Sequence, residues 1–118
     1  MDGAGYSYPD RVGYVRDFRH VVLTMRSTQG TFQVRIQGSV AEKMPDFTLT
    51  STSDNQWDYV ESKDLEDGTT IDGDTGVGFT GTATRIVEVN TNHLRWLALR
   101  VVGYAAGEVT VVMAASPN

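Results

Sequence analysis

The sequence contains no cysteine among its 118 residues, which excludes a disulfide framework, a thiolate nucleophile and a Cys-ligated zinc. Histidine is nearly absent too, and His20 and His93 are expected on separate strands or strand ends. A cupin-like metal site needs two or three converging histidines and a carboxylate, and no G-x-S-x-G nucleophile elbow is present. The residues therefore predict a protein that is not an enzyme and has no cofactor and no metal centre.

Long apolar runs are also missing, since none approaches the ~18 residues that span a bilayer. The start, Met1-Asp2-Gly3-Ala4-Gly5, lacks the positive and apolar regions of a secretory signal, so we expect synthesis in the cytoplasm and no membrane partner. The net charge of −5 and the pI of about 4.8 argue against nucleic acid as a partner, because phosphate binding needs clustered Lys and Arg.

Acidic residues are concentrated in the middle of the chain, where ten acidic and two basic side chains lie between residues 45 and 90. A calcium site would need several carboxylate and carbonyl oxygens on a tight loop. The spacing departs from D-x-[DN]-x-[DN]-G with a later glutamate, so Asp-Gly turns are predicted instead. A solvated face and a surface complementary to a basic partner both remain open. The cluster comprises Asp64, Glu66, Asp67, Asp72 and Asp74.

The C-terminal part reads as two strands, 94–102 and 109–114, joined across two glycines, and the pattern predicts a β-hairpin. Its core-facing positions are expected to be the odd ones, Leu97, Leu99, Val101, Val109, Val111 and Met113. The other face is largely apolar as well, which is unusual for a solvated surface. The hairpin is therefore either covered on both sides or is the wall against which a second protomer packs.

Similar alternation predicts a second hairpin over 18–25 and 31–37, with Val21, Leu23 and Met25 on one strand and Phe32, Val34 and Ile36 on the other facing the core. Further strands are expected over 56–63, near 70–71 and 77–79, and over 84–89, while 38–53 is expected to be a crossing loop. These elements predict an all-β fold, an antiparallel β-sandwich or jelly roll of about seven or eight strands over residues 17–118.

Residues 1–16 have no sustained period and are expected to form an extended N-terminal arm. Three tyrosines in this segment suggest an interface, because an aromatic ring with a polar tip favours contacts between proteins. The arm either packs on a neighbouring chain or folds back over its own domain. Candidate contacts with a partner or protomer are Tyr6, Tyr8, Tyr14, Trp57, Tyr59 and Trp96. Exposed Trp and Tyr also bind sugars, so a glycan-binding β-sandwich is the alternative.

Four segments, Asp17–Thr24, Asn55–Val60, Lys63–Gly76 and Val89–Trp96, together resemble small virion proteins of tailed bacteriophages, and above all the capsid decoration or cement class. The resemblance spans most of residues 17–114. It implies a homo-oligomer, with a trimer favoured and a dimer as the alternative. It also implies binding to the major capsid protein at junctions between subunits, on the capsid exterior. A tail or fibre subunit is the other virion role considered.

Overall fold

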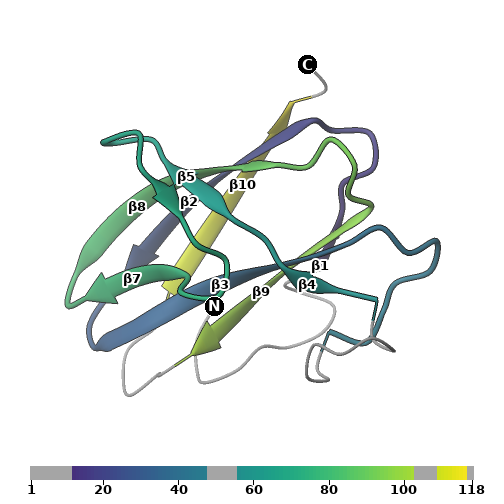
Figure 1. Cartoon of the computed structure of the whole chain (residues 1–118). Helices are drawn as coiled ribbons and strands as arrows, with labels where there is room; N and C mark the ends of the chain where they lie inside the picture. Colours follow the sequence, from purple (N-terminus) through teal and green to yellow (C-terminus); the bar gives the residue numbers. More distant parts are fainter. Residues whose placement is uncertain (1–11, 48–55, 103–108, 117–118) are drawn as a thin grey trace.

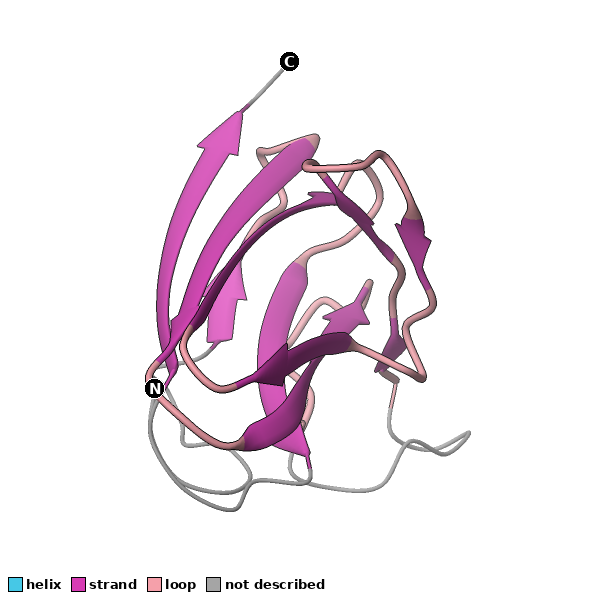
Figure 2. Cartoon of the chain, turned by 90° about the vertical axis from the view of Figure 1, so that its left-hand side faces the viewer, coloured by secondary structure: helices cyan, strands magenta, loops and turns pink. Residues whose placement is uncertain are grey.

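The computed structural model describes residues 12–47, 56–102 and 109–116, and every regular element within these ranges is a β-strand. Two antiparallel sheets of five strands each lie face to face (Figures 1 and 2). The predicted all-β class is therefore confirmed, and the arrangement is consistent with a β-sandwich. Nowhere in the described ranges is there a helix with the length and apolar character needed to span a membrane.

Sheet I runs in the order β1 (Val12–Tyr14), β9 (Trp96–Val102) and β3 (Thr31–Ser39), whose far edge pairs with both β4 (Asp58–Tyr59) and β7 (Val77–Thr80). Sheet II runs in the order β10 (Val109–Ser116), β2 (His20–Ser27), β8 (Ala83–Asn90), β5 (Ser62–Asp64) and β6 (Thr70–Ile71). The described residues thus hold ten strands, against about seven or eight expected from the sequence. The difference comes from strands of two or three residues, which are too short to show a period.

The core fills the space between the sheets, and the alternation in the sequence identified most of it. All nine inward positions predicted on β2, β3 and β9 are buried, none being more than 7% exposed. Val87 and Val89 on β8 join them at 0% exposed, whereas Ile86 points to the opposite side and is 43% exposed. Strands β2, β3, β8 and β9 therefore each have one face in the core, as the two-residue period of a strand requires.

Both predicted hairpins are wrong, because their strands belong to different sheets. β9 lies in sheet I while β10 pairs with β2 in sheet II, and β2 and β3 are divided between the sheets in the same way. The connections therefore cross from one layer of the sandwich to the other. Alternation does not distinguish a hairpin within one sheet from a crossing between sheets, since in both arrangements one face of each strand points toward the core.

Long-range hydrogen bonds hold the crossing between β2 and β3. The Ser27 hydroxyl donates to the Gly81 carbonyl (2.6 Å) and accepts from the Ala83 amide (3.1 Å), while the Gly81 amide donates to the Gly30 carbonyl (2.7 Å). The connection between β2 and β3 is thereby bound to the one between β7 and β8. Ser27 is 0% exposed, so its hydroxyl replaces the hydrogen bonds that these groups would make with water.

Other expectations change at the level of single segments. The strand predicted over 56–63 is two short strands in different sheets, β4 and β5. The last part of the predicted arm belongs to the sandwich, because Val12–Tyr14 form β1 and Val15 is 0% exposed, while residues 1–11 lie outside the described residues. Met113 was expected in the core and is instead 49% exposed, although it lies opposite the buried Leu23; β10 is the edge strand of sheet II and has a neighbouring strand on one side only.

Candidate functional site

The predicted contact residues come together mainly on the outer face of sheet I. Tyr14 on β1 lies opposite Trp96 on β9, and their rings meet edge to face with centroids 4.9 Å apart. Tyr14 is 46% exposed, while Trp96 is half-buried and its indole N–H donates to the Ala41 carbonyl at 3.1 Å. This pair is the exposed end of the aromatic surface. The remaining arm tyrosines, Tyr6 and Tyr8, lie outside the described residues.

Trp57 and Tyr59 belong to a second, smaller core on the same face. Trp57 is 4% exposed and packs with Phe47 and Ala98, which are fully buried. Its ring centroid is 5.1 Å from that of Tyr59 and 6.1 Å from that of Phe47. Trp57 therefore has a packing role within its own chain, and its ring is not presented to a ligand or partner. Sequence reasoning missed Phe47 because it stands alone, without a periodic neighbour.

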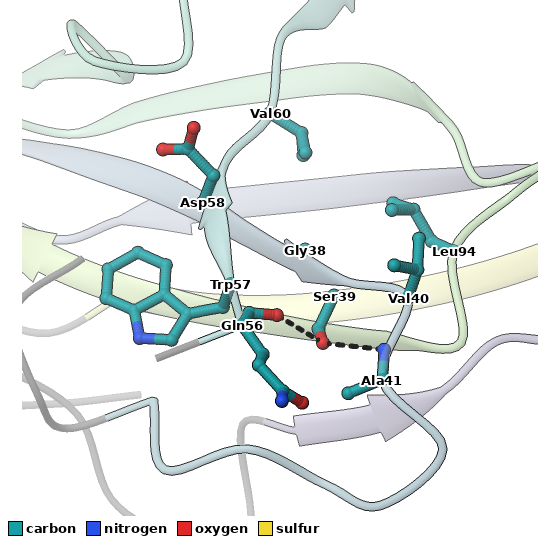
Figure 3. A pocket seen from close by; sticks show the side chains of 9 residues that line it. All are labelled: Gly38, Ser39, Val40, Ala41, Gln56, Trp57, Asp58, Val60 and Leu94. Atoms are coloured by element: carbon teal, nitrogen blue, oxygen red, sulfur yellow. Dashed lines mark hydrogen bonds between the residues drawn. The ribbon is translucent and has the colours of Figure 1, made fainter. Parts of the chain in front are cut away.

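A groove opens beside this cluster, with a volume of about 480 Å³ (Figure 3). Val40, Val60 and Leu94 contribute apolar side chains to the groove, and its lining also includes Trp57 and the Ser39 hydroxyl. That hydroxyl is already committed, because it donates to the Gln56 carbonyl at 2.7 Å and accepts from the Ala41 amide at 3.1 Å. The groove thus presents mostly apolar surface, with the exposed Gln56 and Asp58 side chains at its border.

Two arginines lie side by side further along the same face. Arg35 on β3 is directly opposite Arg100 on β9, and both approach Tyr59. The Arg35 guanidinium lies 5.3 Å from the centroid of the Tyr59 ring, and Arg100 Nη1 donates to the Tyr59 hydroxyl at 3.5 Å. The aromatic ring offsets part of the repulsion between the two like charges. Two cationic side chains therefore lie next to each other on the outer face of sheet I.

The acidic cluster forms turns. Carboxylate oxygens of Asp64, Asp67 and Asp72 each accept a hydrogen bond from the backbone amide two residues later, at 2.8–3.0 Å. The Thr69 hydroxyl also donates to Asp67 at 2.7 Å, and this bond, followed by the one from the Thr69 amide, lowers the pKa of Asp67 below 3.8. These three carboxylates therefore stabilise turns of the backbone, the usual role of Asp in an Asx turn. Across the described ranges, no three metal-ligating side chains are grouped to hold an ion.

The two histidines belong to different elements. His20 begins β2, and its Nδ1 lies 3.9 Å from the Glu88 carboxylate on β8 at the solvent-exposed face of sheet II. His93 is exposed in the connection between β8 and β9. Among the described residues, neither histidine belongs to a group of three side chains that could hold a metal ion.

The outer face of sheet II carries exposed apolar side chains that sequence reasoning only partly identified. Val112 on β10 and Ile86 on β8 flank Thr24 on β2 in one cross-strand row, and they are 63% and 43% exposed. Leu65, whose amide donates to the Ile86 carbonyl, is 44% exposed. We call this row, Val112, Thr24, Ile86 and Leu65, the sheet II apolar row. The sequence did indicate two of these residues, because Ile86 and Val112 alternate with the core-facing positions of their strands and so lie on the outer face.

The unusually apolar outer faces of the two C-terminal strands, β9 and β10, differ in whether other residues cover them. On β9 it is covered, because Ala98 is buried under Phe47 and Trp57. On β10 it is uncovered by the described residues, since Val112 and Ala114 are exposed. Cover on both sides, the first explanation considered for the sequence, therefore holds for β9, while packing of a second protomer stays an untested prediction for β10.

Comparisons with models of protein families, with curated proteins and with solved structures found no match. The class that the fold defines is an all-β protein of two antiparallel sheets.

Proposed function

We propose that this protein is a non-enzymatic virion structural protein that decorates a bacteriophage capsid and stabilises it by binding the major capsid protein at junctions between subunits. The observation that carries the proposal is the sheet II apolar row, of which Val112, Ile86 and Leu65 are each at least 43% exposed. Apolar side chains gathered on one face of a soluble protein favour contact with another protein. The site of action under this proposal is the capsid exterior, reached after synthesis in the host cytoplasm.

We also propose that the two sheets form a jelly roll, and the strand order supports this. Eight strands form two sets of four, β1-β9-β3-β7 and β2-β8-β5-β6, if β4 and β10 are set aside as additions. In each set the first strand in the chain is followed by the last, then by the second and the third. Jelly rolls of eight strands occur in viral capsid proteins and in lectins, so this analogy between folds supports both the virion role and the glycan alternative.

The first test measures binding to empty, expanded heads of tailed bacteriophages that lack a decoration protein. We expect the wild-type protein to co-sediment with the heads and to saturate at a fixed ratio to the major capsid protein. Failure to bind any head in such a panel would contradict the capsid role, and binding to purified tails alone would assign a tail or fibre role. A homo-oligomer is expected to bind best, because linked weak sites raise the effective concentration.

A matched pair of variants locates the contact on the protein. Ile86 and Met44 are equally exposed at 43%, but Ile86 lies in the sheet II apolar row and Met44 in the connection after β3. Ile86→Lys is expected to weaken head binding at least about tenfold, because a charge would be buried in an apolar contact. Met44→Lys is expected to bind like the wild type. Equal losses in both variants would place the contact elsewhere.

The N-terminal arm is tested in the full chain. Tyr6→Ala together with Tyr8→Ala is expected to weaken head binding without changing the unfolding transition, if these rings contact a neighbouring chain. Unchanged binding would exclude them from the contact.

Glycan binding remains the second function, and the groove beside Trp57 is the observation that favours it. The buried Trp57 ring makes sugar stacking on it unavailable, so Tyr14 and Trp96 are the rings to test. A glycan array with a signal that is lost in Tyr14→Ala would favour this function over the capsid role.

A further inference from the structure

The edge strand β10 is an addition to the eight-strand arrangement and contributes little to the core. Among its residues of described burial, 109–115, Val109 alone is buried and Val111 is half-buried. Val112 and Met113 are 63% and 49% exposed, and Ala114 and Ala115 are exposed as well. Within the described part of the chain, β10 pairs with β2 alone, over its full eight residues. It is therefore a long edge strand whose outer backbone groups face no other strand among the described residues.

Proteins normally protect such an edge with charge, proline or a very short strand, because an open edge pairs with other chains. The other edges of this sandwich follow that rule: β1 has three residues, β4 and β6 have two each, and β7 has four. By contrast β10, with the sequence Val-Thr-Val-Val-Met-Ala-Ala-Ser, contains no charged residue and no proline. Its composition favours pairing where the other edges disfavour it.

We propose that β10 pairs with β10 of a second copy of this chain, antiparallel and about a two-fold axis, joining two copies of sheet II into one continuous sheet. An antiparallel strand can pair with its own copy, and residues directly opposite one another must point to the same face of the joined sheet. A register centred on Val112 satisfies this condition. It places Val112 opposite its own copy on the outer face and Val111 opposite Met113 on the inner face.

The charge distribution favours β10 over the opposite edge of sheet II for pairing with a second copy. Each chain carries a net charge of −5, so two copies repel unless their acidic regions stay apart. The acidic turns at Asp64, Asp67 and Asp72 adjoin β5 and β6, at the edge of sheet II opposite β10. Pairing through β10 therefore places the two acidic clusters at the two far ends of the joined sheet.

This contact goes beyond the capsid role and does not depend on it. A two-fold contact produces a dimer, so it favours the dimer over the trimer that the family resemblance favours. It also leaves the two apolar rows on the same face of the joined sheet, where both could contact one partner surface.

Sedimentation velocity of the full chain, without any capsid, tests the association. We expect a dimer that dissociates on dilution. A monomer at every soluble concentration would overturn the proposal, and so would a trimer, while either result would leave the capsid role to be decided by head binding.

Cross-linking tests which strand makes the contact, and the absence of cysteine makes the design simple. Val112→Cys introduces a single thiol at the proposed axis, and Ile86→Cys introduces one on the same outer face but on the inner strand β8. A short bis-maleimide is expected to give a covalent dimer with Val112→Cys and mostly monomer with Ile86→Cys. Equal yields from both variants would overturn the proposed register.

Charge at the same two positions gives an independent measurement. Val112→Lys is expected to raise the dimer dissociation constant at least about tenfold, because two like charges would lie directly opposite. Ile86→Lys is expected to leave it within about threefold of the wild type. Far-UV circular dichroism checks that both variants are folded, which the exposure of the two side chains favours. Unchanged association of Val112→Lys would overturn the proposal.

Discussion

Two glycines with the same backbone conformation, Gly68 and Gly76, differ in what surrounds them. Their φ angles are +78° and +80°, in the region that disfavours any residue with a Cβ. A Cβ on Gly68 would meet nothing within 4 Å, whereas one on Gly76 would lie 2.8 Å from the Val34 carbonyl oxygen. Glycine is therefore favoured at position 76 for two reasons: its positive φ angle and the close approach of the β3 backbone.

Alanine substitutions at these two positions separate the cost of the positive φ angle from the cost of the close contact with Val34. Gly68→Ala is expected to lower the free energy of unfolding by about 1 kcal/mol, the cost of a positive φ. Gly76→Ala is expected to lower it by about 1–3 kcal/mol more, because the Val34 backbone must move. Urea unfolding of the two variants measures the difference. Equal losses would mean that the chain relieves the contact without cost.

The segment between β3 and β4 contains an anchor that the sequence pattern did not indicate. Phe47 is fully buried between Trp57 and Ala98, and its carbonyl accepts a hydrogen bond from the buried Gln37 amide at 3.0 Å. Phe47→Ala is expected to lower the free energy of unfolding by about 3–5 kcal/mol. The exposed Met44 in the same segment is the control, and Met44→Ala is expected to change it by less than about 0.5 kcal/mol. Equal stability of the two variants would show that the segment is not anchored.

The elements also show how far the sequence determines the fold. Alternation identified the inward faces of β2, β3, β8 and β9, because burial of one face follows directly from a period of two. It could not give the pairing, since β9 and β10 satisfy the same pattern as a hairpin or as a crossing between sheets. The crossing from β2 to β3 depends on contacts such as that of Ser27 with Gly81 and Ala83, which are more than fifty residues away in the sequence.

The candidate surfaces were predictable to a different degree. The sequence named Tyr14 and Trp96, which do meet at the surface, but it could not distinguish them from the buried Trp57. The same aromatic residue types occur in protein cores and in interfaces. Whether such a residue is buried depends on which segment of the chain covers it. Here that segment is the one containing Phe47, whose position depends on tertiary packing.

At the scale of the whole molecule, the separation of charge from the proposed dimer contact predicts a weak dependence on salt. Four strand spacings of about 4.8 Å separate β10 from β6, so each acidic cluster lies about 19 Å from its own chain's β10 edge. The Debye length is about 10 Å at 0.1 M salt, and the two clusters are farther apart still, which leaves their repulsion largely screened. The dimer dissociation constant is therefore expected to change by less than about threefold between about 0.1 and 1 M sodium chloride.

Sedimentation velocity at several salt concentrations measures this dissociation constant, with Ile86→Lys as a control for a charge on the outer face. A steep dependence in the wild type would mean that charged surfaces, such as the Arg35 and Arg100 pair against the acidic turns of a second copy, join the chains instead of β10.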